Sequence, residues 1–366
     1  MKILVVGSYV TKIYDKALYD AFCKLGYDTY KFSWNKYFDK YFNYLSSFSF
    51  SWKNFREYPA KFLEAIKRAE HKYHIGPTVD KMNKGLIAYA KEVRPDLIFI
   101  QYGVFFSPST IRALRAIGAM VFGYNNDDPF NNTAQKYFWR KYLSSCPEYD
   151  YMFSFRLKNI EDYKRVFGMN SEILRAYYIK DRNFHIDIPD ERYKCDISFV
   201  GHYEDDGRDE FLIELVRGGY SFKLYGTEWH RSKYYEEFKK FMKGDIQPVR
   251  EDYNLALNSC KIALSFLSHL NNDTYTRRTF EIPATGTFML STYTEDLATL
   301  FEPDKEAVYF KTSDEMISKV DYYLAHDDER KKIARNGYER LIRDGHEVTD
   351  RAKQIIRTYE RIKRGK

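Results

Sequence analysis

Short hydrophobic runs alternate with amphipathic segments along most of the chain, and this alternation predicts its secondary structure. In the first half, apolar and β-branched runs predict strands at residues 2–7, 27–32, 96–101, 120–124, 151–155 and 172–176. Apolar residues at helical spacing predict helices at 12–25, 78–93 and 159–167, and Ser107 or Ser109 is placed to cap one more. Strands that alternate with helices through short connections favour a parallel sheet.

The second half repeats this alternation. It predicts strands at residues 195–200, 220–225, 262–266 and 307–310, another that ends at Leu290, and a short edge strand at Ile246. Helices are expected at 209–216, 238–242, 251–259, 295–300, 313–325, 327–344 and 349–364. We therefore predict an α/β fold with two Rossmann-like domains, at residues 1–178 and 193–366, whose parallel sheets face each other across a cleft. This is the GT-B arrangement.

Two segments show no regular hydrophobic period. Residues 179–192 are polar, contain a proline and show no period, so we expect a linker between the domains, with the last helix crossing back to the first domain. Residues 35–75 are rich in aromatic residues and lysine but show no clean period. They either pack helices on the sheet or form an insertion that shapes a binding pocket.

Composition sets limits on location and partners. No apolar run approaches the roughly 20 residues that a membrane span needs, and no signal stretch follows the first strand, so we expect a cytoplasmic protein. The four cysteines have no paired spacing, which favours free thiols over disulfides or a metal site. Much of the net charge of +7 lies in the last predicted helix. That helix is a solvated surface element, or it contacts anionic lipid head groups or a polyanion such as nucleic acid.

The stretch RRTFEIPATGTFM, at residues 277–289, carries the most chemistry. Arg277 and Arg278 are planar donors suited to phosphate oxygens, and Glu281 is a carboxylate suited to a ribose or sugar hydroxyl pair. Gly286 permits a tight turn into the buried strand that follows. Alternatively, the arginines are surface cations and Glu281 is stabilised by the helix dipole. Near the carboxyl edge of a parallel sheet, this stretch predicts a cradle for a nucleotide sugar.

Other predicted strand ends also carry polar residues. YNNDDP, at residues 124–129, follows a strand of the first half and places Asp127 and Asp128 where ligands bind in open parallel sheets. The same sequence is also good turn chemistry. The first loop, GSYVTK, lacks the second and third glycines of a dinucleotide fingerprint, so we expect no dinucleotide there.

Several of these stretches resemble a known family. DISFVGHYEDDGR (196–208), KLYGTEW (223–229), RRTFEIPATGTFMLS (277–291) and the segment 314–346 resemble the spore-maturation CgeB-like glycosyltransferases, a branch of the GT-B enzymes. The resemblance covers about 170 residues of the second half in order. YNNDDP and the YMFSF strand extend it weakly into the first half.

The resemblance implies roles for particular residues. Retaining GT-B enzymes carry two carboxylates with seven residues between them, and Asp273 and Glu281 have this spacing, with Asp in place of the usual first Glu. Glu281 is then expected to bind the nucleotide ribose, and Asp273 to lie near the donor sugar. The remaining donor-side candidates are the strand exits and the arginines, namely Gly201, His202, Arg208, Gly226, Trp229, Arg277 and Arg278. Asp127 or Asp128 would be the acceptor-side base.

The function expected from the sequence is transfer of a sugar from a nucleotide-diphosphate sugar, with a UDP-sugar favoured, to an acceptor hydroxyl. By resemblance the reaction needs no metal. The two carboxylates imply retention of the anomeric configuration, and inversion is left open as the alternative. The acceptor is left open as a glycan, a lipid-linked precursor, a protein or a modified nucleic acid. Two alternatives stay open, a nucleotide-sugar epimerase of the same fold and a non-catalytic nucleotide-sugar-binding protein. His202 is either a phosphate contact or a structural residue, and Trp229 either stacks on the base or packs.

Overall fold

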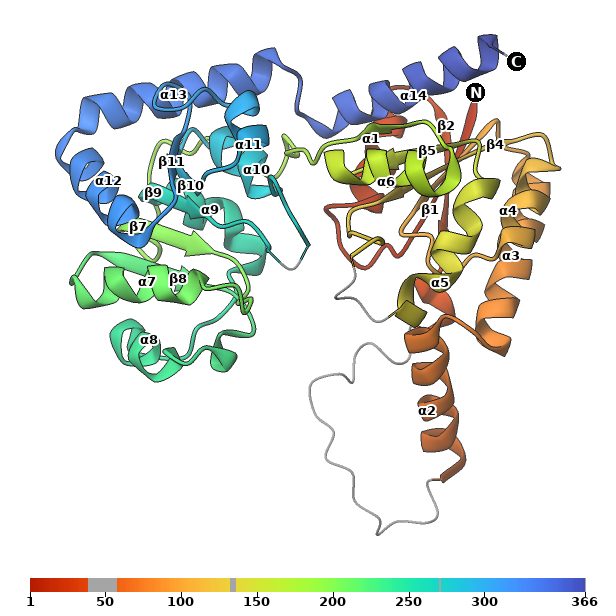
Figure 1. Cartoon of the computed structure of the whole chain (residues 1–366), viewed down its shortest axis with the longest axis horizontal. Helices are drawn as coiled ribbons and strands as arrows, with labels where there is room; N and C mark the ends of the chain where they lie inside the picture. The colour runs from red at the N-terminus through yellow and green to blue at the C-terminus, as the bar shows by residue number, and fades with distance from the viewer. Residues whose placement is uncertain (39–57, 132–135, 270, 366) are drawn as a thin grey trace. The chain divides into compact units, whose positions relative to one another are not determined.

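The computed structural model describes residues 1–38, 58–131, 136–269 and 271–365 (Figure 1). The chain divides into two compact units. The first unit comprises residues 1–175 together with residues 348–366, and the second comprises residues 176–347. Each unit is built around one parallel sheet with its own hydrophobic core. This agrees with the two-sheet α/β architecture predicted from the alternation of strands and helices.

The sheet of the first unit has six parallel strands in the order β2-β1-β3-β4-β5-β6. They are β1 (Lys2–Gly7), β2 (Asp28–Ser33), β3 (Leu97–Gln101), β4 (Met120–Asn125), β5 (Tyr151–Ser154) and β6 (Ser171–Ile173). The helices are α1 (Asp15–Lys24), α2 (Tyr58–Tyr73), α3 (Pro77–Val93), α4 (Pro108–Arg115), α5 (Lys136–Ser145), α6 (Leu157–Phe167) and α14 (Val348–Arg364), with short 3₁₀ turns η1 (Asn35–Tyr37) and η4 (Cys146–Glu148).

The central strands of this sheet are buried on both faces, which explains why they read as continuous apolar runs. Ile3, Val5, Phe99 and Phe122 have no exposed surface. Val5 pairs with Phe99, and Phe99 pairs with Phe122, so the register brings these side chains into one row across three strands. Ser107 caps α4 by accepting a hydrogen bond from the Thr110 N–H, which confirms one of the two predicted caps.

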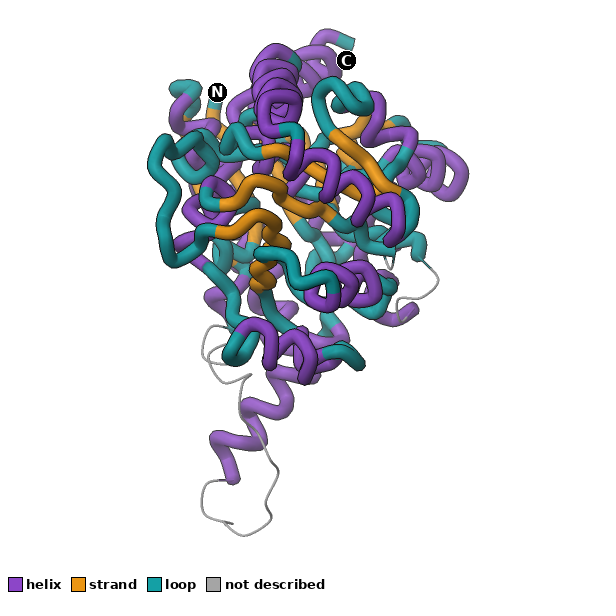
Figure 2. Tube along the Cα trace, turned by 90° about the vertical axis from the view of Figure 1, so that its left-hand side faces the viewer, coloured by secondary structure: helices purple, strands orange, loops and turns teal. Residues whose placement is uncertain are grey.

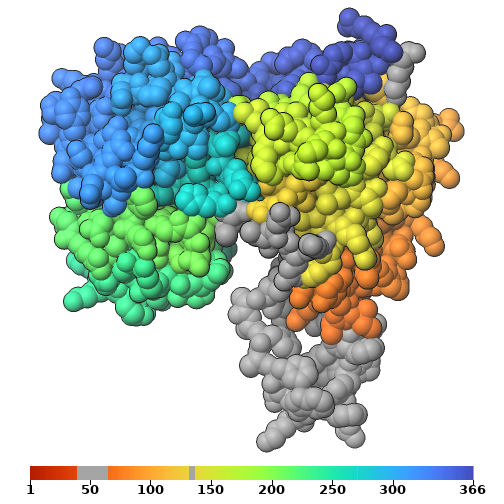
Figure 3. Space-filling view, in the orientation of Figure 1, coloured from red at the N-terminus to blue at the C-terminus, as the bar shows by residue number. Residues whose placement is uncertain are grey.

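The last helix, α14, belongs to the first unit although it ends the chain. The Gln354 side chain donates to the Ile173 carbonyl at 2.8 Å, Arg351 donates to the Arg175 carbonyl at 3.0 Å, and Arg361 pairs with Glu172 at 3.0 Å. Figure 3 shows α14 lying along the surface formed by residues just before position 175. Part of the basic character of this helix is therefore used to attach it. None of the described helices is long and apolar enough to cross a membrane.

The sheet of the second unit has five parallel strands in the order β11-β10-β9-β7-β8. They are β7 (Cys195–Val200), β8 (Phe222–Tyr225), β9 (Cys260–Ser265), β10 (Phe288–Thr292) and β11 (Val308–Phe310). The helices are α7 (Arg208–Arg217), α8 (Tyr235–Met242), α9 (Tyr253–Asn258), α10 (Arg278–Ala284), α11 (Glu295–Leu300), α12 (Ser313–Ala325) and α13 (Asp327–Arg343), with 3₁₀ turns η5 (Trp229–Arg231) and η6 (Arg250–Asp252). In Figure 2 the strands of this unit lie between helices.

The edge strand predicted at Ile246 is wrong, because residues 245–249 have no regular structure and Gln247 only accepts one hydrogen bond, from the Gly226 N–H. Residues 179–192, expected to form a linker, lie in the second unit and are bonded to it, for example through the Phe184 N–H and Asn254. Of the segment 35–75, residues 39–57 lie outside the described residues.

Candidate functional site

The candidate site of the second unit lies at the carboxyl ends of β9, β7 and β8, which are neighbours in the sheet. β7 is followed by Gly201 and His202, β8 by Gly226, and β9 by Phe266. Because all three strands are parallel, these exits meet at one edge, the edge where open α/β sheets bind ligands. The sequence RRTFEIPATGTFM contributes α10, which begins at Arg278 and follows the loop after β9.

Gly226 lets the exits of β7 and β8 pack against each other. Its φ of +149° lies in the region that favours glycine, and a Cβ there would stand 1.9 Å from the Gly201 carbonyl oxygen. The Trp229 indole N–H donates to the same Gly201 oxygen at 2.9 Å. Trp229 is only 1% exposed and packs edge-on against Phe199. The structure therefore places Trp229 in the core, where it fixes the Gly201 exit and has no free ring face for a base.

A network of charged groups holds the loop between Gly201 and α7. Arg208 binds Asp206 through two hydrogen bonds, of 2.8 and 2.6 Å, and donates to the His202 carbonyl at 2.9 Å. Its side chain is 1% exposed, and that of Asp206 is 2% exposed. Arg208, expected from the resemblance to contact the diphosphate, is thus buried and engaged with a carboxylate. Its contacts with Asp206 and the His202 carbonyl stabilise the loop.

Glu204, which the sequence analysis did not single out, is the centre of this network. Its carboxylate accepts hydrogen bonds from His202, at 2.8 Å, and from the Ser268 hydroxyl on the loop after β9, and it lies 3.4 Å from Arg208. Burial works to raise the pKa of Glu204, but the His202 hydrogen bond, the Arg208 charge and the Ser268 hydrogen bond outweigh it and hold this pKa at about 2. Glu204 therefore ties the exits of β7 and β9 together as an anion.

Arg277 and Glu281 form an ion pair of 2.9 Å, one turn apart at the start of α10. The other carboxylate oxygen of Glu281 accepts from the Tyr253 hydroxyl at 2.9 Å. The Arg277 guanidinium lies over the Tyr177 ring, 4.9 Å from its centroid. Burial, followed by the charge of Glu281, raises the pKa of Tyr253 well above its ordinary value, so this hydroxyl stays a donor. Glu281 is held in one orientation from two sides.

Arg278 differs from the other two arginines because it has no ion pair with any described residue. Its guanidinium contacts the carbonyl oxygens of Val200 and Phe266, at 3.5 and 3.4 Å, and lies over the Phe199 ring. Burial lowers the pKa of Arg278, and its other electrostatic neighbours are Tyr253, Arg208, Glu281 and Glu204. Within the described part of the chain, Arg278 is thus a cation that no carboxylate pairs with directly.

Asp273 lies on the loop between β9 and α10. It is partly exposed, and its main-chain N–H donates to the Ser268 carbonyl at 2.9 Å. The loop is anchored on its far side, where the Thr274 hydroxyl donates to Asp296 at 2.6 Å. Asp273 is therefore on the same loop as Ser268, the residue that bonds Glu204. Within the described residues, no group of three or more His, Cys, Asp or Glu side chains is arranged to hold a metal ion.

In the first unit, the structure separates the two candidate bases at the end of β4. Asp128 is 2% exposed and accepts hydrogen bonds from Asn159, at 2.7 Å, and from the Phe130 N–H, at 3.0 Å, and Lys158 lies 3.4 Å away. These partners make Asp128 a structural residue of the turn.

Asp127 is the candidate base whose carboxylate is not bonded to another described side chain. Its side chain has no hydrogen bond or ion pair to any described residue, although its main-chain N–H donates to Asn125. Burial raises the pKa of Asp127, and the charge of Arg156 opposes that shift. The ring of Tyr102, at the end of β3, stands near enough for the Asp127 charge to help raise its pKa, after burial. A half-buried carboxylate with a raised pKa at a strand end suits a general base.

Replacing Gly226 with alanine should destabilise the second unit, because the new Cβ would collide with the Gly201 carbonyl in a backbone conformation that alanine rarely adopts. We expect Gly226→Ala to lower the free energy of unfolding by about 1–3 kcal/mol, measured by urea denaturation. Gly244→Ala is the matched control, since a Cβ there would meet nothing within 4 Å, and it should change stability by less than about 0.5 kcal/mol. Equal effects of the two substitutions would contradict this account of Gly226.

The low pKa of Glu204 predicts a pH-dependent stability. The folded-state pKa, about 2, lies below the ordinary value of 4.5, so the charged form stabilises the fold above pH 4.5, and this contribution is lost as the pH falls toward 2. Glu204→Gln should therefore cost on the order of 3 kcal/mol at pH 7, and the difference from the wild type should shrink between pH 4.5 and 2.

The measurement is urea denaturation at a series of pH values, with Glu210→Gln as the control. Glu210 forms an exposed ion pair with Lys233, so its substitution should change little at any pH. A difference between Glu204→Gln and the wild type that is the same at pH 3 and pH 7 would show that Glu204 is not held as an anion by its neighbours.

Comparison with known proteins adds to this geometry. Residues 208–357 match the model of a family described as glycosyl transferase-like. Among solved structures, the chain is similar to sucrose-phosphate synthase from Thermosynechococcus elongatus (12% identity, TM-score 0.66, all of both chains covered) and to Anabaena HepE in complex with UDP-glucose (10% identity, TM-score 0.67, 98% of this chain and 99% of that one).

A putative UDP-N-acetylglucosamine 2-epimerase from Listeria monocytogenes is also similar, at 12% identity and a TM-score of 0.55, with 97% of this chain and 94% of that one covered. A search of curated proteins finds no match. At such identities the structural likeness concerns the fold alone. The chain has the GT-B fold, and a glycosyl transferase-like sequence runs through most of its second unit.

Proposed function

We propose that the protein is a glycosyltransferase that moves a sugar from a UDP-sugar to an acceptor hydroxyl. The observation that carries the proposal is Arg278, a cation that has no ion pair with any described residue, at the carboxyl ends of β7 and β9, with Tyr253, Glu281 and Glu204 among its electrostatic neighbours. The match of residues 208–357 to a glycosyl transferase-like family supports it. So does the similarity to HepE, whose structures hold UDP and UDP-glucose.

Arg278 would bind the diphosphate of the donor. As the bond between the anomeric carbon and the β-phosphate oxygen breaks, its electron pair moves onto the phosphate, and a fixed cation there stabilises the transition state without a metal. Glu281 is held by Arg277 and Tyr253 in one orientation, which suits a carboxylate that accepts from the two ribose hydroxyls. Arg208, His202 and Glu204 hold the exit loops in place around this cation.

The acceptor oxygen forms the new bond to the anomeric carbon and gives up its proton. We assign that proton to Asp127, whose raised pKa and lack of a described partner fit a base. The spacing of Asp273 and Glu281 favours retention instead, in which case the proton passes to the leaving phosphate. The anomeric configuration of the product, read by NMR, distinguishes the two routes.

The similarity to a putative epimerase supports a second candidate function, epimerisation of the UDP-sugar. An epimerase would convert the UDP-sugar without any acceptor, and NMR of the donor incubated alone would reveal the epimer. If the donor is bound but remains unchanged with every acceptor, the protein is instead a nucleotide-sugar-binding protein.

Binding of UDP should depend on Arg278. We expect UDP, but not ADP or GDP, to raise the melting temperature of the wild type by mass action, and Arg278→Gln to abolish most of this rise. With a saturating UDP-sugar, Arg278→Gln should lower kcat about 100-fold or more, the range seen when one fixed electrostatic contact is removed. Arg217→Gln, an exposed arginine in the last turn of α7, is the control and should behave as the wild type. Unchanged UDP binding and rate in Arg278→Gln would remove the basis of the proposal.

Transfer should also depend on Asp127 but not on Asp128. Asp127→Asn is expected to lower kcat by about 100-fold or more while the UDP-induced rise in melting temperature is unchanged. Because the pKa of Asp127 is raised, lowering the pH should begin to reduce the wild-type rate while the pH is still above the ordinary carboxyl range. Asp127→Asn should not show this loss of rate at low pH. Asp128→Asn should mainly lower thermal stability, because Asp128 holds Asn159 and Lys158. Full activity of Asp127→Asn would exclude Asp127 as the base.

A further inference from the structure

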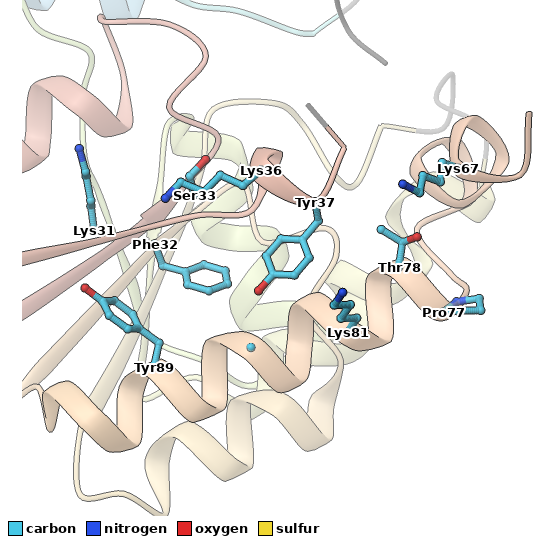
Figure 4. Close-up of a pocket in the computed structure, with 11 residues that line it drawn as sticks. Lys31, Phe32, Ser33, Lys36, Tyr37, Lys67, Pro77, Thr78, Lys81 and Tyr89 are labelled. Carbon is cyan, nitrogen blue, oxygen red and sulfur yellow. The ribbon is translucent and has the colours of Figure 1, made fainter. Parts of the chain in front are cut away.

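The first unit contains a pocket that the proposed donor site does not use. It has a volume of about 930 Å³ and lies between the edge strand β2, the turn η1 and helix α3 (Figure 4). This volume is in the range of sites that bind small molecules. Ser33 lies at the carboxyl end of β2, and Thr78 lies in the first turn of α3, so the pocket reaches the carboxyl edge of the sheet.

The lining of the pocket is strongly basic. Lys31, Lys36, Lys67 and Lys81 contribute to it, and none of its described lining residues is acidic. Lys36 and Lys81 are exposed and have no hydrogen bond or ion pair with any described residue. Like charges around one cavity repel each other and concentrate anions there. The lysines therefore indicate a negatively charged ligand, and lysine ammonium groups are common phosphate and carboxylate binders.

The pocket also has an aromatic wall. The rings of Phe32 and Tyr37 lie 6.0 Å apart, and those of Phe32 and Tyr89 lie 6.3 Å apart. Figure 4 shows these three side chains between β2 and α3. Tyr37 reaches the helix because α3 has a glycine at position 85, where a Cβ would stand 2.1 Å from the Tyr37 hydroxyl. Aromatic faces beside hydroxyl groups suit a ring that has apolar and polar sides, as a sugar has.

The position of the pocket relates it to Asp127. β2 and β4 are separated by β1 and β3 in one parallel sheet, so their carboxyl ends lie three strand spacings apart, about 14 Å. Ser33 ends β2, and Asp127 follows the end of β4, so both face the same edge of the same unit. A short oligosaccharide can span this distance.

We propose that this pocket holds the charged end of an anionic oligosaccharide that serves as the acceptor, with Lys36 and Lys81 attracting it from two sides of the pocket and the aromatic wall against a sugar ring (Figure 4). The inference rests on the proposed function, because it places the acceptor hydroxyl at Asp127. A pocket bounded by a strand, a turn and a helix fits a compact sugar better than the long groove that a nucleic-acid strand needs.

Binding to the full-length protein is measured by isothermal titration calorimetry in low salt with five probes. They are trigalacturonate, phosphorylated maltotriose, maltotriose, inorganic phosphate and hexathymidylate. At least one of the two anionic trisaccharides should bind tenfold or more tightly than maltotriose and than inorganic phosphate, and which one does so identifies the acidic group. Lys36→Gln/Lys81→Gln should weaken this binding tenfold or more. Lys84→Gln/Lys91→Gln removes the same charge from exposed positions of α3 that do not line the pocket, and should change it less than twofold.

Four results would overturn the proposal. They are no binding of either anionic trisaccharide, equal binding of maltotriose, equal binding of inorganic phosphate alone, and an affinity that is the same in Lys36→Gln/Lys81→Gln. Tighter binding of hexathymidylate with the same lysine dependence would assign the pocket to nucleic acid instead. The rise in melting temperature with UDP is recorded in parallel and should not depend on these lysines. Loss of trisaccharide binding with this rise intact refutes the pocket alone, and the reverse result refutes the donor site alone.

Discussion

The candidate donor site depends on one guanidinium, that of Arg278, which forms no ion pair with any residue that the structure describes. Removing a charge from water costs several kcal/mol unless a partner or a ligand compensates for it. Around Arg278 the carboxylates are already engaged, Glu281 with Arg277 and Tyr253, and Glu204 with His202, Ser268 and Arg208. Among the described residues, the Arg278 guanidinium makes two long hydrogen bonds to carbonyl oxygens and lies over the Phe199 ring. In the proposed donor complex, an anionic ligand would supply the counter-ion, and part of its binding energy would come from relieving this unpaired charge.

That arrangement requires the strand exits to be held closely, and buried residues do this. Gly226 allows the β8 exit to approach the Gly201 carbonyl, and Trp229 donates to the same oxygen. Arg208 and Asp206 close the loop that follows. None of these four residues needs to touch a ligand to matter, since each fixes the backbone that surrounds Arg278. Substituting them would move the cation relative to the donor, and a displacement of this kind is costly in catalysis.

Much of the fold could be predicted from the sequence because buried parallel strands have continuous apolar sequences. Leu97–Gln101 and Cys195–Val200 are examples, since side chains on both faces are covered. The prediction at Ile246 failed because a single apolar residue carries no period, and only tertiary pairing decides whether it joins a sheet. The motif at Arg277–Met289 was found because two arginines, a carboxylate and a glycine lie close together in sequence.

The roles within the site could not be read from the sequence, because residue type does not show which partners a side chain finds. Arg208 and Arg278 cannot be told apart from the sequence. In the structure, only Arg208 forms an ion pair with a carboxylate two residues away, that of Asp206. Trp229 could equally have faced a base, and its burial depends on Phe199 and Phe238 from other elements. Glu204 gave no signal because its partners His202 and Ser268 come from different strand exits.

The different partners of Asp127 and Asp128 likewise give these two neighbouring residues different roles in the first unit. Adjacent carboxylates on an extended turn point to different sides, so one can be used by the fold while the other stays available. Asn159 and Lys158 on α6 take Asp128, and the desolvated Asp127 is left at the sheet edge with the proton affinity of a base. The basic pocket beside β2 opens on that edge as well. An acceptor anchored by its charge at one end of the edge would present a hydroxyl at the other, so the sheet itself sets the length of chain that this unit can accept.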